Sequence, residues 1–345
     1  GDFMIDTGIS VYAGLSDYSK DENIKYLRNA KELGITHVFS SAHINEAKTS
    51  QEELQSIIDE CNELGLKLSL DVSKPIMSKF SELNGLFALR LDYGFTDDEI
   101  IELSKSAPYY VELNASTLSY EHIKSLIDNG INTSRTRFTF NFYPKLYTGH
   151  DIIDVYNKTK ICNEVGIYVG AFIPSHYGFR PPMYEGLPTV EAHRKMDLSV
   201  AIEELKACGV NGIYFGDAYA SYDEIKLLND HNTAEILLKL QLNNSDNNLD
   251  YLFEKSFKIR PDLNSYILRV SSLRSTIEIS SFNTVDRKRY DVTLDNSKFK
   301  RYAGEINIVL QDLPKDERVN VIGSLNTTEI IVNKIKLGNR FKFIK

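Results

Sequence analysis

The sequence predicts a (β/α)8 barrel of the TIM type followed by a small all-β domain. From residue 8 to about residue 230 of the 345-residue chain, short apolar segments alternate with segments of helical periodicity. Strands that alternate with helices pair in parallel through right-handed crossovers, which is compatible with an open doubly wound sheet or a closed barrel. Eight expected strands within about 220 residues favour the closed barrel.

The eight strands are expected at the apolar segments that precede the helical stretches. They are Ile9–Tyr12, His37–Ser41, Lys67–Asp71, Ala88–Asp92, Tyr110–Asn114, Arg137–Phe142, Tyr168–Ile173 and Gly212–Asp217. Three helices are expected at Asp21–Leu33, Gln51–Leu64 and Asp197–Cys208, each followed by the glycine of a left-handed cap. The residues after the first strand lack the Gly-x-Gly-x-x-Gly pattern, which weighs against a dinucleotide fold.

The character of the chain changes after Leu240. Residues 243–248 are Asn, Asn, Ser, Asp, Asn and Asn, a polar sequence typical of a linker. We therefore expect a catalytic barrel at 1–242, a linker at 243–249 and a small β-barrel domain at 250–345. Strands without clear helices are expected there at Ser265–Val270, Thr276–Ile279, Asp291–Leu294, Gly304–Leu310, Asn320–Leu325 and Glu329–Ile335.

The charge of the chain excludes several classes of partner. Asp and Glu number 48 and Lys and Arg number 40, so the net charge is −8. Nucleic acids and anionic membranes require a basic face, so we expect neither as a partner. No apolar run approaches the roughly 20 residues of a membrane span, no secretory leader is visible, and the three cysteines are far apart. A cytoplasmic location is the simplest expectation.

Acids and amides follow the expected strands, where the working residues of such a barrel lie. The candidate catalytic residues are Asp71, Asp92, Asp217 and Glu112. Side-chain alternation along a strand places Arg90 with Asp92, and Glu112 with Asn114, on the same inner side. Each acid alone could instead cap the helix that follows it. Several together indicate a carboxylate pair of the kind that glycosidases use, with one proton donor and one anion.

Two loops carry basic side chains in an otherwise acidic protein. The loop after the seventh strand, residues 174–194, is long enough to indicate a lid or binding loop instead of a rigid surface excursion. The candidate substrate-binding residues are Arg90, Asn114, Asn141, Tyr143, Lys145, His176, Arg180, Glu185, His193 and Arg194. Basic groups around an acidic rim suggest an anionic small molecule, such as a sugar phosphate or a carboxylate.

Other chemistries have weaker support. His43, His176 and His193 could contribute to a metal site, but their spacing matches no common metal motif, so we expect no metal and no cofactor. No Gly-x-Ser-x-Gly sequence indicates a serine nucleophile. Lys74 and Lys145 are the only lysines near a strand end that could form a Schiff base, and solvent exposure or anion binding is the simpler role for both.

Several short motifs occur in a fixed order along the chain. They are Gly8–Tyr12, Asp71-Val72-Ser73, Arg90–Gly94, Leu113–Ser116, Asn141–Pro144, Glu185–Thr189, His193-Arg194 and Gly216-Asp217. In this order the sequence resembles the 6-phospho-N-acetylmuramidase (MupG-type) family of glycoside hydrolases over the whole barrel. The C-terminal part resembles the cyclophilin-like β domain of that family.

The resemblance implies a substrate and a reaction. It implies hydrolysis of N-acetylmuramic acid 6-phosphate–N-acetylglucosamine in cell-wall recycling, with a phosphorylated amino sugar as the partner and no cofactor. The phosphate and the lactyl carboxylate of this sugar would bind the basic loops, and its acetamido group could act as the nucleophile. A sugar-phosphate isomerase or aldolase, and a carbohydrate-binding surface protein without activity, remain alternatives. A homodimer is possible.

Overall fold

The computed structural model describes residues 5–42, 48–77, 85–243, 248–271 and 277–345. The chain divides into two compact units, one ending at Asn232 and the other beginning at Thr233. Each unit has its own sheet, so each is described by itself.

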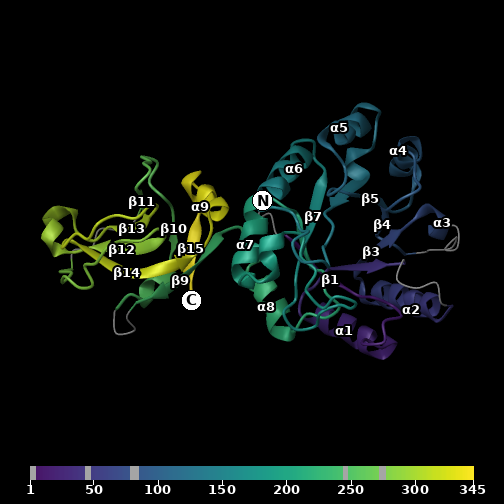
Figure 1. Cartoon of the computed structure of the whole chain (residues 1–345), viewed down its shortest axis with the longest axis horizontal. Helices are drawn as coiled ribbons and strands as arrows, with labels where there is room; N and C mark the ends of the chain where they lie inside the picture. Colours follow the sequence, from purple (N-terminus) through teal and green to yellow (C-terminus); the bar gives the residue numbers. More distant parts are fainter. Residues whose placement is uncertain (1–4, 43–47, 78–84, 244–247, 272–276) are drawn as a thin grey trace. The chain divides into compact units, whose positions relative to one another are not determined.

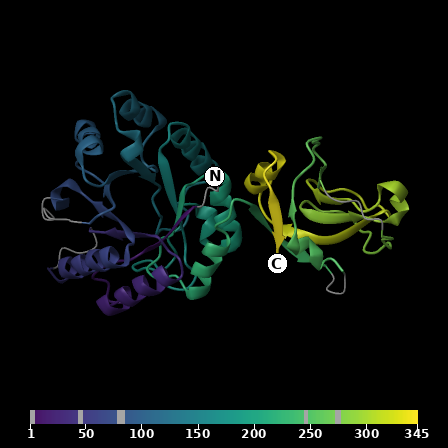
Figure 2. The same cartoon turned by 180° about the vertical axis from the view of Figure 1, so that it is seen from behind.

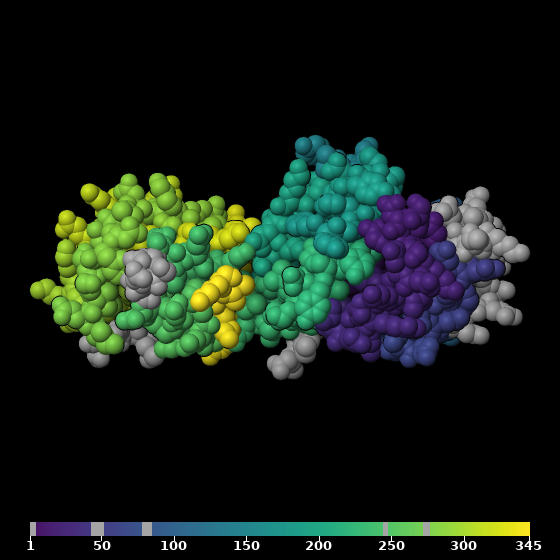
Figure 3. Space-filling view, turned by 90° about the horizontal axis from the view of Figure 1, so that it is seen from below, coloured from purple at the N-terminus to yellow at the C-terminus, as the bar shows by residue number. Residues whose placement is uncertain are grey.

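The first unit is a closed barrel of eight parallel strands, which confirms the predicted fold class (Figure 1). Each strand pairs with the next, and β8 pairs in parallel with β1 to close the ring. The strands are β1 (Asp6–Ser10), β2 (His37–Ser41), β3 (Lys67–Val72), β4 (Ala88–Leu91), β5 (Tyr110–Asn114), β6 (Thr136–Thr139), β7 (Tyr168–Ile173) and β8 (Gly212–Phe215). In Figure 3 the purple N-terminal residues lie against green residues from the end of this unit, as the closure requires.

Helices surround the barrel strands on the outside (Figure 1, Figure 2). They are α1 (Lys20–Glu32), α2 (Lys48–Leu64), α3 (Lys74–Met77), α4 (Asp97–Ser106), α5 (Tyr120–Asp128), α6 (Ile152–Glu164), α7 (Leu198–Cys208) and α8 (Tyr222–Asp230), with short 3-10 turns η2 (Thr133–Arg135) and η3 (Glu191–Arg194). Capping boxes begin α1 at Ser19, α4 at Thr96 and α8 at Ser221, because each hydroxyl accepts an N–H from the first turn. Gly209 ends α7 in the left-handed conformation, as its place in the sequence predicted.

Aromatic side chains fill one side of the barrel at its carboxyl end. Tyr12, Phe39, Phe172 and Tyr214 form a buried cluster, and Phe142 packs against it. These residues come from β2, β7 and β8 and from the segments that follow β1 and β6. Polar residues at the ends of β3, β4 and β5, such as Asp71, Arg90 and Asn114, do not belong to this cluster.

The second unit is built on one mixed sheet of seven strands, in the order β10-β15-β9-β14-β12-β13-β11. Its strands are β9 (Ile236–Leu242), β10 (Ser256–Phe257), β11 (Ile267–Arg269), β12 (Asp291–Asp295), β13 (Ile306–Val309), β14 (Val319–Asn326) and β15 (Phe341–Ile344). Two 3-10 segments, η4 (Asp250–Glu254) and η5 (Ser297–Tyr302), and one helix, α9 (Glu329–Lys336), complete it.

Two of the strands expected in this unit differ from the structure, and β10 and β15 were not expected. The strand expected at Glu329–Ile335 was wrong, because these residues form α9 and bury Ile330, Ile331, Val332 and Ile335. Of the strand expected at Thr276–Ile279, Thr276 lies outside the described residues and residues 277–279 form no strand.

The division between the units also differs from the expected boundary after residue 242. Strand β9 pairs with β14 and β15, so residues 236–242 belong to the second sheet and not to the barrel. The polar segment that was expected to link the domains therefore follows the first strand of the second unit. Its residues 244–247 lie outside the described residues.

No helix in the described part of the chain has the length and apolar character that a membrane crossing needs.

Candidate active site

Asp71 and Arg90 lie beside each other at the carboxyl ends of β3 and β4. The two residues are partners in the strand register, and Arg90 Nη1 lies 3.6 Å from Asp71 Oδ1. Arg90 is buried, and its guanidinium also donates to Thr139 Oγ1 at 2.8 Å and to Asn141 Oδ1 at 2.9 Å. The Asp71 side chain keeps 15% of its surface exposed. A fixed guanidinium therefore holds a carboxylate that solvent can still reach.

A hydrogen-bonded group of side chains continues from there across β5 and β6. The Ser116 hydroxyl accepts the backbone N–H of Asn141 at 2.8 Å, and Asn114 Oδ1 accepts the backbone N–H of Ser116 at 2.9 Å. His150 Nε2 lies 2.8 Å from Ser116 Oγ and 3.1 Å from Tyr143 Oη. Three predicted residues, Asn114, Asn141 and Tyr143, thus belong to one network.

The surroundings of His150 favour a neutral imidazole ring. Burial, followed by the nearby Lys158 ammonium, lowers the pKa of His150, which favours the neutral ring. The Ser116 hydroxyl already accepts the Asn141 N–H, so its own proton can point to Nε2 of a ring protonated on Nδ1. The sequence did not single out Ser116 and gave no partner for His150, because the two are 34 residues apart.

Arg180 lies on the loop after β7 and faces the aromatic side of the mouth. The centre of its guanidinium is 4.7 Å from the Tyr12 ring centroid and 5.1 Å from that of Phe142. Its buried Nε makes no hydrogen bond to any described residue. This guanidinium lies over two rings and keeps an N–H donor without an acceptor among the described residues, so it is suited to bind an anion.

Asp217, which follows β8, organises this loop from within. Its carboxylate is fully buried and accepts the backbone N–H groups of Ser175 at 2.9 Å, Leu187 at 3.1 Å and Arg180 at 3.2 Å. Burial raises the pKa of Asp217 to about 6, against the opposing effects of these N–H groups and of Arg180. The structure thus places this predicted catalytic acid as an anchor for the loop.

Glu112 is also buried within the barrel. Ser69 Oγ donates to it at 2.6 Å and Arg137 Nε lies 3.4 Å from it. Arg137 in turn donates to Tyr214 Oη at 3.1 Å and lies 3.7 Å from the Tyr168 ring centroid. The Glu112 carboxylate therefore belongs to an internal charge network.

His193 and Arg194 are held inside the fold and not at the mouth. The fully buried His193 shares a 2.8 Å hydrogen bond with Glu204 of α7. Arg194 pairs with Glu191 through two 2.8 Å bonds and donates to the carbonyls of Gly186 and Lys145, each at 3.0 Å. Arg194 thereby ties together the loops that follow β6 and β7.

The remaining candidates lie on the surface of the loops. Asp92, Lys145 and His176 are exposed, and Glu185 is half-buried. Asp92 directly follows β4, where its backbone N–H donates to the Val72 carbonyl at 2.9 Å. This bond keeps Asp92 beside the end of β3, one strand away from Asp71.

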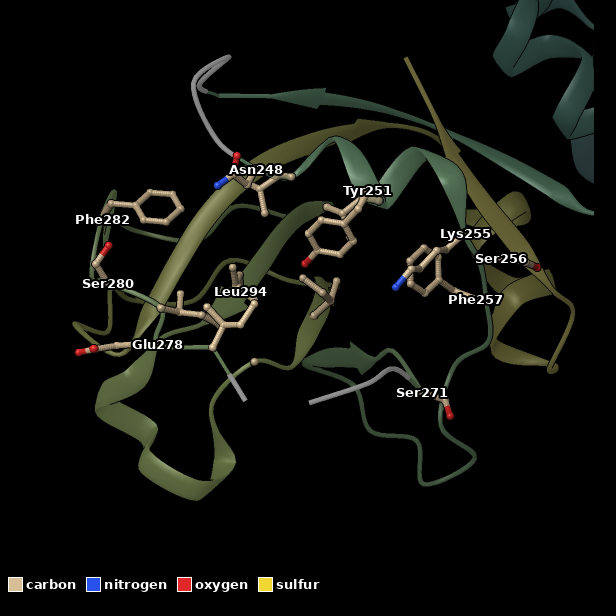
Figure 4. A pocket seen from close by; sticks show the side chains of 16 residues that line it. Asn248, Tyr251, Lys255, Ser256, Phe257, Ser271, Glu278, Ser280, Phe282 and Leu294 are labelled. Atoms are coloured by element: carbon tan, nitrogen blue, oxygen red, sulfur yellow. The ribbon is translucent and has the colours of Figure 1, made fainter. Parts of the chain in front are cut away.

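The second unit contains a cavity of about 590 Å³ on the apolar face of its sheet. Leu294, Tyr251, Lys255 and Phe257 are among the side chains that line it (Figure 4). Groups of three or more metal-ligating side chains are absent from the described residues of both units.

Comparisons with known proteins place this architecture in a family. The N-terminal family model described as 6-phospho-N-acetylmuramidase matches residues 7–230, and the C-terminal model of the same description matches residues 235–344. The chain belongs to the 6-phospho-N-acetylmuramidase family. The match covers both units, which confirms the resemblance seen in the sequence.

Two solved structures are similar over nearly the whole length. An uncharacterized B. cereus protein is 25% identical with a TM-score of 0.88, and the alignment covers 99% of this chain and 100% of that one. A protein of unknown function from Enterococcus faecalis is 30% identical with a TM-score of 0.74, and the alignment covers 98% of this chain and 96% of that one. The comparison with curated proteins found no match.

Proposed function

We propose that the protein hydrolyses N-acetylmuramic acid 6-phosphate–N-acetylglucosamine to N-acetylmuramic acid 6-phosphate and N-acetylglucosamine. The family is named for a glycosidase of this type, and its models match both units. The observation that carries the proposal is the partly exposed Asp71 carboxylate beside the buried Arg90 at the barrel mouth. Such a reaction belongs to the recycling of cell-wall fragments in the cytoplasm.

Two carboxyl groups are available for the chemistry that glycoside hydrolysis needs. In this proposal Asp92 protonates the leaving oxygen, because it lies at the open end of β4 and is exposed. Asp71, fixed beside Arg90, acts as the anion that orients the substrate's acetamido group or activates water. Glu112 and Asp217 do not contact the substrate in this proposal, because their carboxylate oxygens accept hydrogen bonds from within the barrel and its loops.

The proposed substrate carries two anionic groups, and the mouth offers a matching cation. Arg180 has a buried Nε without a partner among the described residues and lies over Tyr12 and Phe142. It would bind the phosphate or the lactyl carboxylate, while the two rings would face the apolar side of the sugar. His150, Ser116 and Tyr143 would orient the hydroxyl or amide groups of the sugar from the other side.

Mass spectrometry of the products tests this function. The protein is incubated with the phosphorylated disaccharide and, in parallel, with the same disaccharide without phosphate. From the phosphorylated disaccharide we expect two products whose masses add up to that of the substrate plus one water. The disaccharide without phosphate should be cleaved much more slowly. Equal cleavage of both would contradict recognition of the phosphate, and no cleavage of either would contradict the proposed function.

A further inference from the structure

A second, smaller cavity lies on the polar face of the second sheet, opposite the apolar face shown in Figure 4. Strand alternation places Arg269, Thr293, Asp295 and Asn307 on this face, and Leu268, Leu294, Ile306 and Ile308 on the other. Segment η5 adds Phe299 and Tyr302 as an aromatic wall. The volume is about 300 Å³, at the lower end of the range for small-molecule sites.

Most charged groups in this cavity are already paired. Arg269 binds Glu305 through two hydrogen bonds of 2.5 and 2.8 Å, and Asp316 binds Arg318 through bonds of 2.9 and 2.7 Å. The guanidinium of Arg287 donates twice to the carbonyl of Pro314, at 3.1 and 2.8 Å. These contacts fix the walls before any ligand arrives.

Asp295 is the exception. Its backbone completes the sheet, but its half-buried carboxyl group forms no hydrogen bond or ion pair with the described residues. Burial, and then the neighbouring Glu305, raise the pKa of Asp295 to about 7, while Arg269 and Arg287 oppose this. A half-buried carboxyl group without a donor is costly, because its lost contacts with water are not replaced.

Charge and size define the ligand that would correct this. Of the three carboxylates that line the cavity, Glu305 pairs with Arg269 and Asp316 pairs with Arg318, so Asp295 is the one without an ion pair among the described residues. A cation of small volume would supply the missing partner of Asp295. Thr293 and Asn307 offer groups for hydroxyls, and Tyr302 and Phe299 offer ring surface.

We propose that this cavity binds a small amino sugar through its primary ammonium group, with Asp295 as the counter-ion. The site lies wholly in the second unit and is independent of the hydrolysis proposed for the barrel. Binding there would make the C-terminal unit a sensor or holder of a free amino sugar.

Isothermal titration of the full-length protein tests this site. Glucosamine serves as the probe, and N-acetylglucosamine serves as the matched sugar without the cation. We expect saturable binding of glucosamine and at least roughly tenfold weaker binding of N-acetylglucosamine in this cavity. No saturable binding of glucosamine, or equal binding of both sugars, would overturn the proposal.

Two variants with opposite effects locate the binding. Asp295→Asn keeps the shape but removes the charge, so glucosamine should bind roughly tenfold or more weakly. Arg287→Gln removes a competing cation, so glucosamine should bind several-fold more tightly, and this result decides the matter if Asp295→Asn does not fold. The control Asp250→Asn changes an exposed acid of η4 and should leave binding unchanged. Unchanged binding in both cavity variants would place glucosamine elsewhere and overturn the proposal.

Discussion

The carboxylate of Asp217 accepts the backbone N–H of Arg180 at 3.2 Å. This bond joins the end of β8 to the loop after β7, at the residue whose guanidinium lies over Tyr12. The acid thus sets the position of the cation that we propose as the anion-binding group. Arg180, which would bind the anion, follows β7, whereas Asp217, which positions Arg180, follows β8.

Asp217→Asn should loosen this loop. The amide would turn an NH2 group or a single oxygen towards three backbone N–H groups, so at least one of them loses its acceptor. We expect the free energy of unfolding to fall by about 1–3 kcal/mol and KM to rise more than kcat falls. Chemical denaturation and steady-state kinetics measure the two effects. An unchanged KM would show that the loop keeps its binding geometry without Asp217.

The same residue predicts a pH dependence of stability. Burial raises the pKa of Asp217 to about 6 in the folded protein, whereas an unfolded aspartate titrates near 3.9. Between these values the folded protein holds a proton that the unfolded chain has lost, so the free energy of unfolding falls as the pH rises from about 4 to about 6. The loss is at most on the order of 3 kcal/mol.

Denaturation at a series of pH values checks this slope. Asp217→Asn cannot titrate at that position, so the difference between wild type and variant should change across the same range of pH. A difference that stays constant from about pH 4 to about pH 6 would contradict the raised pKa.

Arg180→Gln should weaken substrate binding. It removes the guanidinium proposed to bind an anionic group, and such charge-assisted bonds contribute about 1.5–3 kcal/mol. We expect KM for the phosphorylated disaccharide to rise by roughly 10- to 100-fold. The matched control Arg28→Gln removes an exposed arginine of α1 that pairs with Glu60, and its KM should equal that of wild type. Equal KM values for wild type, Arg180→Gln and Arg28→Gln would contradict a role of Arg180 in substrate binding.

The loss of kcat caused by Asp92→Asn should depend on the leaving group of the substrate. If Asp92 protonates the leaving oxygen, its loss should lower kcat for the disaccharide by roughly 10²- to 10⁴-fold. A nitrophenyl glycoside of the same phosphorylated sugar has a leaving group that needs no proton, so its hydrolysis should fall far less. Kinetics with both substrates decide the role. An equal loss with both would argue that Asp92 has another function.

The barrel strands could be predicted from sequence because each is a short, mostly apolar run that alternates with a segment of helical periodicity. Three of them, His37–Ser41, Tyr110–Asn114 and Tyr168–Ile173, have the expected bounds. The segment at 329–336 misled the prediction because Ile330, Ile331 and Val332 favour strands. Packing of this apolar face in the folded unit overrides that local preference.

The sequence identified the polar strand ends but not the direction of their side chains. Asp71 lies near the end of β3 and Asp217 follows β8, yet Asp71 pairs with Arg90 at the mouth and Asp217 binds backbone N–H groups of a loop. His193 was expected at the mouth, but its partner Glu204 lies 11 residues further on, in α7. Such differences depend on loop paths, which residue type and spacing do not specify.

The turnover number of Asp71→Asn on the phosphorylated disaccharide tests the central claim most directly. The substitution keeps the size of the side chain and removes the charge beside Arg90. We predict that kcat falls by about 10²-fold or more while the circular dichroism spectrum and the denaturation midpoint stay close to those of wild type. A folded Asp71→Asn protein with the full wild-type kcat would contradict the claim that the barrel mouth works through this carboxylate.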